Sequence, residues 1–91
     1  MRRYIIERQI PQIGDASAEA LQAAAERSNT VLCELGPRIQ WIQSYVAGDR
    51  TFCVYLAEDE EVIRRHAEIS GFPASAIHAI HHMIDPTTAT P

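Results

Sequence analysis

Residues 39–56, with the sequence IQWIQSYVAGDRTFCVYL, decide the fold because they combine two strand-forming runs with a tight turn. Residues 39–46 and 52–56 are rich in β-branched and aromatic side chains, which favour strands. Gly48-Asp49 between them is typical of a two-residue hairpin loop, since glycine readily adopts the positive φ that such a turn requires. The stretch therefore predicts an antiparallel pair of strands.

The length of this loop sets which residues of the two strands face each other. A two-residue loop predicts Ser44 opposite Cys53, Ile42 opposite Tyr55 and Tyr45 opposite Phe52. A three-residue loop would shift one strand by one position and pair Tyr45 with Cys53 instead. We take the first register as the prediction.

The remaining elements follow outward from the hairpin. Residues 4–8 are partly β-branched and predict a first strand. Ser17 is a typical helix N-cap, and apolar residues then recur at helical spacing until Gly36-Pro37. Acidic residues 58–61 predict the first turn of a second helix, which ends at Gly71. Residues 77–84, IHAIHHMI, predict a last strand, followed by a loose tail at 87–91.

This order of elements predicts an α+β fold, a ferredoxin-like βαββαβ sandwich. Two right-handed crossovers give a four-stranded antiparallel sheet in the order 4-1-3-2, with both helices on one face. The chain has 91 residues, which is enough for one small domain, expected at residues 1–86.

Two helices leave the second face of such a sheet uncovered. Alternation along the strand suggests that Phe52, Val54 and Leu56 lie under the helices. The open face would then carry Cys53, Tyr55, Ser44 and Ile42. A half-apolar open face is usually covered by a partner, and a second copy of the chain is the simplest one. We therefore expect a homodimer with a dimeric α/β-barrel-like interior.

The composition restricts the partners and the compartment. The formal net charge is −4, and no basic patch interleaved with aromatic residues occurs, so neither nucleic acid nor an anionic membrane surface is an expected partner. The apolar run at residues 4–6 is too short for a signal peptide, and no later run approaches membrane-spanning length. We expect a cytoplasmic protein in which Cys33 and Cys53 are free thiols.

Histidines are the most conspicuous candidates for chemistry. His66 falls on the apolar stripe of the second helix, where it is either a packing residue or a metal-ligating or acid–base group near Cys53 or Glu7. On a strand, His78 and His82 would lie roughly 13 Å apart, because each residue advances about 3.3 Å. His78, His81 and His82 therefore receive no assigned role. No phosphate loop, nucleophile elbow, CxxC or HExxH motif is present.

Short motifs spread from residue 4 to residue 86 resemble one known family. They are IER and IP near the N-terminus, then IQW, SYV, FCVY, EEV, HA, GFP and IDP, in that order. The chain resembles a family of small bacterial ferredoxin-like proteins of unknown general function, which includes a nickel-binding homodimer. The resemblance implies the same fold and a homodimer. Its matched polar positions are Glu7, Ser44, Tyr45, Cys53, Tyr55 and His66.

Two functions are carried forward. The first is a non-enzymatic, metal-binding homodimer, with nickel or another divalent transition ion held by Cys53, His66 and Glu7, since thiolate and imidazole suit such ions. Ser44, Tyr45 and Tyr55 are then candidate ligand-binding residues. The alternative is a dimeric α/β-barrel-type enzyme or small-molecule-binding protein with a pocket between sheet and helices. There His66 would be a general base, and Tyr55 or Tyr45 a donor.

Cavity size separates these two functions. A pocket of several hundred Å³ favours an organic molecule, whereas a tight polar cluster favours an ion or plain packing. In the latter case the protein would be a purely structural dimer. Cys33 lies beside the apolar stripe of the first helix and is expected to stay outside any site.

Overall fold

The computed structural model describes residues 1–90. The main elements occur in the predicted order: β1 (Arg2–Gln9), α1 (Ala18–Leu35), β2 (Ile39–Ala47), β3 (Arg50–Ala57), α2 (Glu60–Ser70) and β4 (Ala76–Ala79). Three short 3-10 helices accompany them: η1 (Ile13–Asp15), η2 (Gly36–Arg38) and η3 (Pro86–Ala89). Among the described residues, no helix is both long and apolar enough to cross a membrane.

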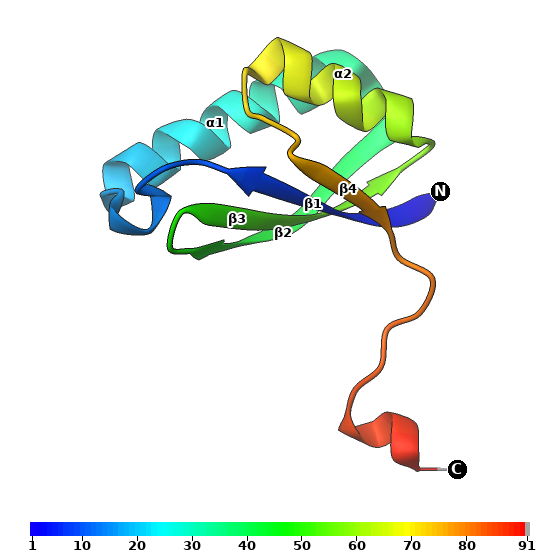
Figure 1. The fold of residues 1–91 in the computed structure, drawn as a ribbon. Coiled ribbons are helices and arrows are strands. Elements are labelled where there is room, and N and C mark those ends of the chain that lie inside the picture. The colour runs from blue at the N-terminus through cyan, green and yellow to red at the C-terminus, as the bar shows by residue number, and fades with distance from the viewer. Residues whose placement is uncertain (91) are drawn as a thin grey trace.

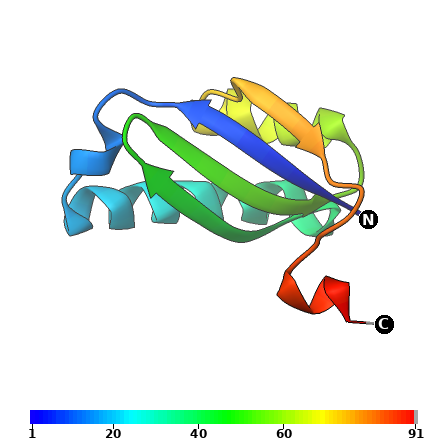
Figure 2. The ribbon, with the colours of Figure 1, turned by 60° about the horizontal axis from the view of Figure 1, so that its bottom comes forward.

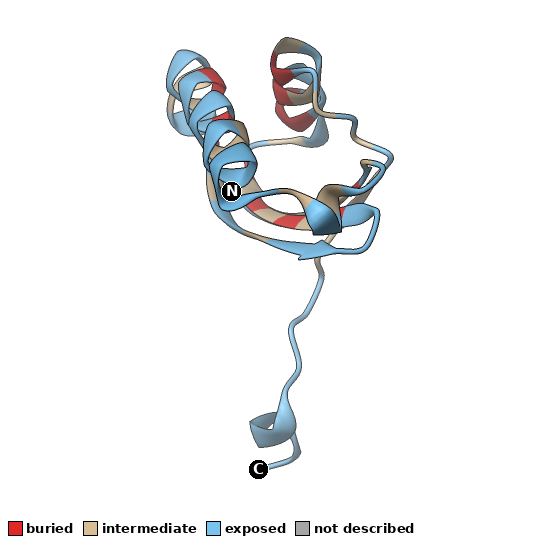
Figure 3. Ribbon diagram, turned by 90° about the vertical axis from the view of Figure 1, so that its left-hand side faces the viewer, coloured by how far each residue is buried: buried red, intermediate tan, exposed pale blue. Residues whose placement is uncertain are grey.

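The sheet is antiparallel throughout, with the strand order β2-β3-β1-β4. This is the predicted order 4-1-3-2 counted from the opposite edge. Both helices lie on the same face of the curved sheet (Figures 1 and 2), and the other face is uncovered (Figure 3). The predicted ferredoxin-like fold is confirmed.

α1 begins after the predicted N-cap Ser17, and α2 ends at the predicted Gly71, but Asp59, predicted within the first turn of α2, is its N-cap instead. The Ser17 hydroxyl accepts a hydrogen bond from the Ala20 amide at 3.1 Å, and the Asp59 carboxylate accepts one from the Val62 amide at 2.9 Å. These contacts satisfy backbone donors that have no partner inside the helix. Gly71 ends α2 with a φ of 82°, a left-handed conformation that favours glycine.

The hairpin has the predicted two-residue turn, and its register holds on one side of a bulge. Ser44 pairs with Cys53 and Tyr45 with Phe52, as predicted. The register shifts between Trp41 and Gln43, so Trp41 is the residue that faces Tyr55. The prediction of Ile42 opposite Tyr55 was wrong because Ile42 is the extra residue of this bulge.

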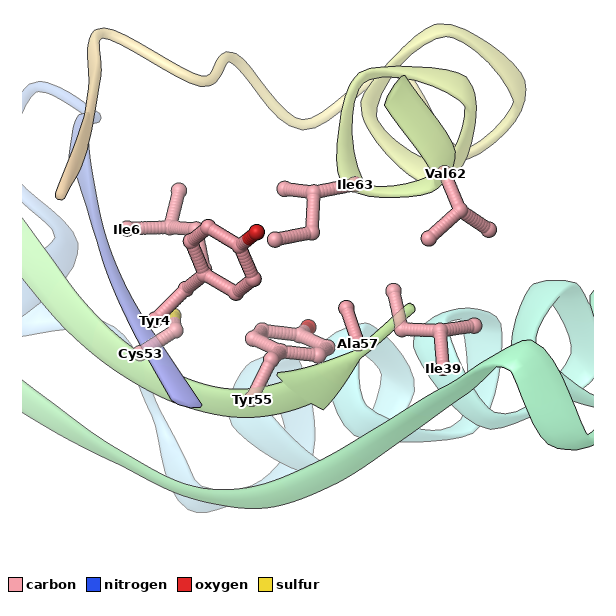
Figure 4. Close-up of a cluster of buried hydrophobic side chains, with 8 residues drawn as sticks. All are labelled: Tyr4, Ile6, Ile39, Cys53, Tyr55, Ala57, Val62 and Ile63. Carbon is pink, nitrogen blue, oxygen red and sulfur yellow. The ribbon is translucent and has the colours of Figure 1, made fainter. Parts of the chain in front are cut away.

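The two faces of β3 are the reverse of the prediction. Cys53, Tyr55 and Ala57 are buried under the helices, whereas Phe52, Val54 and Leu56 are half-buried on the open face. Cys53 pairs with Ile6, and Tyr55 pairs with Tyr4, across β1. These residues form one core with Ile39, Val62 and Ile63 (Figure 4). Alternation separates the two sets of residues, but both sets are apolar, so it does not tell which set the helices cover.

The last strand is shorter than predicted and spans Ala76–Ala79 rather than residues 77–84. Its ladder with β1 ends when the Ile80 amide donates to the Arg3 carbonyl at 2.8 Å. β1 itself begins at Arg2, so the chain beyond residue 80 has no strand beside it. Residues 81–90 are exposed and lead away from the sheet (Figure 1). Of the predicted tail 87–91, residue 91 lies outside the described residues.

Candidate functional site: a cavity between α1 and the sheet

A cavity of about 420 Å³ lies between α1 and the helix-covered face of the sheet. β2 and β3 form its floor, and α1 forms one wall. Arg8 of β1, the chain around η1 and the connection from α2 to β4 complete the lining. The lining is mostly apolar and includes Ile10, Ile13, Leu21, Trp41, Val46 and Phe72. Its polar members are Arg8, Ser28, Ser44, Thr51 and Tyr55.

Small side chains leave this space open. Ala24 and Ser28 lie four residues apart on the face of α1 that lines the cavity. On the floor, Ser44 and Cys53 face each other across the β2–β3 ladder and also line the cavity. Alanine, serine and cysteine do not reach far enough to fill the gap between the two layers.

Arg8 is the most unusual residue of the lining because it is a buried cation. It is only 3% exposed, and its Nη1 donates to the carbonyl oxygens of Phe72 and Pro73 at 3.2 and 3.0 Å. Its Nη2 is buried and has no hydrogen-bond partner within residues 1–90. No carboxylate of the described chain forms an ion pair with it. The positive charge therefore has no carboxylate partner in the described chain; two backbone carbonyls and the nearby Tyr55 hydroxyl are the groups that interact with it.

His66 connects the two helices beside this cavity. The ring is fully buried, and its Nε2 lies 3.1 Å from the Ser28 hydroxyl oxygen. The ring centroid is 5.6 Å from that of Tyr55. Burial, and then the charge of Arg8, lower the pKa of His66 to about 4, so the imidazole is neutral near pH 7. Its Nδ1 has no partner among the described residues.

Tyr55 is the second titratable group of this cluster. Burial raises the pKa of its hydroxyl, against the smaller effects of Ser28 and Arg8. The phenol therefore stays protonated near neutral pH and keeps a proton that it can donate.

The structure separates Glu7 from the other two predicted metal ligands, Cys53 and His66. Cys53 lines the cavity, with its Sγ 3.6 Å from the Thr51 hydroxyl oxygen, and His66 lies on the same side of the sheet. Glu7 is on the open face, where its carboxylate lies 3.3 Å from His78 Nε2 and 3.4 Å from Arg50 Nη1. Within one chain, the sheet stands between Glu7 and the other two residues.

The predicted ligand-binding residues are divided in the same way. Ser44 and Tyr55 line the cavity, and the Trp41 indole donates to the Ser44 hydroxyl at 2.9 Å. Tyr45 is 58% exposed and faces away from the cavity, because it pairs with Phe52 of the open face. Cys33 is exposed on α1 and is not among the lining residues.

The side chains of one chain do not fit a metal site by themselves. Within residues 1–90, no three histidine, cysteine, aspartate or glutamate side chains lie close enough together to hold one ion. His66 Nδ1 is free to coordinate, but a single buried nitrogen is not a coordination shell. The buried side chains around His66 therefore do not form a metal site within one chain.

Sequence reasoning missed Arg8, to which it assigned no role. A signal was nevertheless present, since Tyr4, Ile6 and Arg8 alternate along β1 and share one face. Trp41 and Thr51 were also missed as lining residues. Trp41 faces Tyr55 only because of the bulge at Ile42.

Comparisons with known proteins agree on the fold. A family model described as "Nickel responsive protein SCO4226-like" matches residues 4–80. The crystal structure of SCO4226 from Streptomyces coelicolor A3(2) is similar, with a TM-score of 0.73 and 19% sequence identity, over 90% of this chain and 99% of that one. No curated protein sequence matches the chain. At this identity, the likeness to SCO4226 concerns the fold alone.

Proposed function

The chain belongs to the family of SCO4226-like nickel responsive proteins, and from this premise we propose that it is a binding protein whose site is the cavity between α1 and the sheet. The observation that carries the proposal is the cavity itself. At about 420 Å³ it is within the size range of small-molecule sites, and its lining is apolar with a few polar groups.

Binding fits the cavity better than catalysis. His66 was the expected general base of an enzyme of this fold, yet it contacts Ser28 and is not itself a lining residue. Its lowered pKa also makes it a weak base at neutral pH. The cytoplasm is the proposed compartment, since it would keep the free thiols of Cys33 and Cys53 reduced.

The open sheet face supports the proposal that the protein is a homodimer. Ile5, Phe52, Val54 and Leu56 lie together on β1 and β3 and are only partly buried. Met83 and Ile84, on the segment that leaves the domain, are 71% and 78% exposed. A second copy packed on the open face would remove this apolar surface from water.

Nickel binding is a second candidate function, favoured by the family description and by one contact. Glu7 Oε1 and His78 Nε2 lie 3.3 Å apart on the open face, and both are atoms that coordinate divalent transition ions. One such pair is incomplete, but a two-fold dimer through this face would bring a second pair toward it. Arg50, 3.4 Å from the same carboxylate, would have to give way.

Filling the cavity tests the leading proposal. N-phenyl-1-naphthylamine, a neutral fluorophore that brightens in apolar surroundings, should bind the wild-type chain at one saturable site. Ala24→Trp places a large ring in the cavity and should abolish this binding. Ala23→Trp is the matched control, because Ala23 is exposed on the same helix and is not a lining residue. Equal binding by both variants would show that the fluorophore binds outside this cavity.

Calorimetric titration of Ni²⁺ tests the second candidate. Glu7→Gln and His78→Gln should each weaken nickel binding, while Cys33→Ser should leave it unchanged. A matching loss in Cys53→Ser and His66→Ala, with Glu7→Gln unaffected, would instead assign the ion to the buried side of the sheet. Elemental analysis of untagged protein purified without added metal shows whether nickel is bound at all.

A further inference from the structure

We infer that the ligand of the cavity is a small organic carboxylate with an apolar body, and that Arg8 recognises its carboxylate. This inference rests on the proposed function, because it names the chemical class that the cavity takes. It is carried by the position of Arg8 in an otherwise uncharged, apolar lining.

The first observation is the charge balance of the lining. Arg8 is its only charged member, since no aspartate, glutamate, lysine or histidine of the described chain lines the cavity. A guanidinium stays protonated at every accessible pH, so the cavity holds a permanent positive charge. Buried charges are normally paired, because moving a charged group out of water costs far more free energy than moving a neutral polar group.

The second observation is that the guanidinium is only partly satisfied. Nη1 donates to the carbonyl oxygens of Phe72 and Pro73, whereas Nη2 has no partner among residues 1–90. These two contacts also hold the side chain in place before any ligand arrives. The geometry and charge of a carboxylate match a guanidinium, and the field of a buried charge acts strongly on such a group.

The remaining polar groups of the lining are compatible with an anion. The hydroxyls of Thr51 and Tyr55 can donate hydrogen bonds to it, and the Tyr55 phenol is protonated at neutral pH. The apolar remainder, which includes Trp41 and Phe72, suits an aromatic or aliphatic body. Cations would meet the charge of Arg8 with no acid nearby to offset it.

Three naphthalene compounds of nearly the same shape test the inference by calorimetry at neutral pH. They are 2-naphthoate, 2-naphthalenemethanol and 2-naphthalenemethylamine, which carry a negative, a neutral and a positive group. The wild-type chain should bind the carboxylate at least about tenfold more tightly than the alcohol, as expected for one charge-assisted contact, and the amine most weakly.

Substitutions of Arg8 show whether its side chain binds the carboxylate of the ligand or only stabilises the fold around the cavity. Arg8→Met should weaken binding of 2-naphthoate by about tenfold or more while changing that of the alcohol by less than about threefold. Arg8→Lys keeps the charge and should retain part of the preference for the acid. Arg64→Met is the matched control, since Arg64 is exposed on α2 and pairs with Glu60. It should leave the whole series unchanged.

Each outcome decides between the inference and its alternatives. If the wild-type chain binds the acid no better than the alcohol, the inference is wrong, although the cavity remains a binding site. If Arg8→Met weakens both compounds equally, Arg8 only braces the connection from α2 to β4, and the inference is also wrong. If Arg8→Met does not fold, the wild-type series still decides. If neither these compounds nor the neutral fluorophore bind, both the inference and the proposed function are wrong.

Discussion

His66 Nε2 of α2 lies 3.1 Å from the Ser28 hydroxyl oxygen of α1, and this contact joins the two helices inside the core. Ser28 also lines the cavity, so the contact connects the packing of the helices to the wall of the site. Arg8 from β1 and Tyr55 from β3 are the charged and titratable groups that act on this ring from the sheet. A neutral imidazole suits this position, because a second positive charge beside Arg8 would be repelled.

The first prediction concerns the pH dependence of stability. The pKa of His66 is lowered from 6.5 to about 4, so between these values the unfolded chain takes up a proton that the folded protein does not. The contribution of neutral His66 is therefore fully present above pH 6.5 and is lost as the pH falls toward 4. The loss should be of the order of 1 to 3 kcal/mol. Urea denaturation at a series of pH values measures it.

Two variants isolate the contribution of His66 from that of the carboxylates. His66→Gln does not titrate and should flatten the profile between pH 6.5 and 4. His82→Gln removes an exposed histidine outside the helices and strands and should keep the wild-type slope. A wild-type slope in His66→Gln would contradict the lowered pKa.

The second prediction distinguishes the two thiols. Cys33 is exposed and Cys53 is buried, so a thiol reagent such as Ellman's reagent should modify one cysteine rapidly in the folded protein. Cys53 lines the cavity from a buried position, so it should react more slowly than Cys33 in the folded protein and react fully in denaturant. Cys33→Ser should abolish the rapid phase and leave dimerisation and nickel content unchanged. Two equally rapid phases in the native protein would contradict the difference in exposure between the two thiols.

The third prediction concerns the close approach of Gly14 to the hairpin. The Gly14 amide donates to the Gly48 carbonyl oxygen at 2.7 Å, and a Cβ at Gly14 would lie 2.8 Å from that same oxygen. Gly14→Ala should therefore push η1 away from the hairpin and lower the free energy of unfolding by about 1 to 3 kcal/mol. Ile13, which lines the cavity, would move with it, so ligand binding should weaken as well.

Chemical denaturation with a neighbouring control checks this effect. Asp15→Ala changes an exposed residue of the same short helix and should alter stability by less than about 0.5 kcal/mol. Equal stability of Gly14→Ala and wild type would show that the two segments separate at little cost.

The fourth prediction tests the proposed homodimer. Val54 lies on the open face between Ile5 of β1 and Gln43 of β2. Val54→Arg would place a charge at the centre of the proposed interface and should convert a dimer into a monomer in light scattering. Gln22→Arg, on the exposed side of α1, should leave the mass unchanged. A wild-type chain that is monomeric at micromolar concentration would remove both the dimer and the two-chain nickel site.

Local sequence was sufficient to predict the elements and their order. Helix caps at Ser17 and Gly71 depend on residues within one turn of them, and the Gly48-Asp49 turn depends on the backbone freedom of glycine. The bulge at Ile42 has no comparable local signal. It places Trp41, instead of the predicted Ile42, opposite Tyr55, and Trp41 lines the cavity.

The sequence by itself determined the order of the elements, the topology of the sheet and the two alternating sets of residues on β3. Only the tertiary structure decided which set the helices cover, because both sets are apolar and alternation is the same for either choice. That decision buried Cys53 and Tyr55 and separated both from Glu7 by the thickness of the sheet. It also buried Arg8, whose partners Phe72 and Pro73 lie 64 and 65 residues away, so their contact exists only in the folded chain.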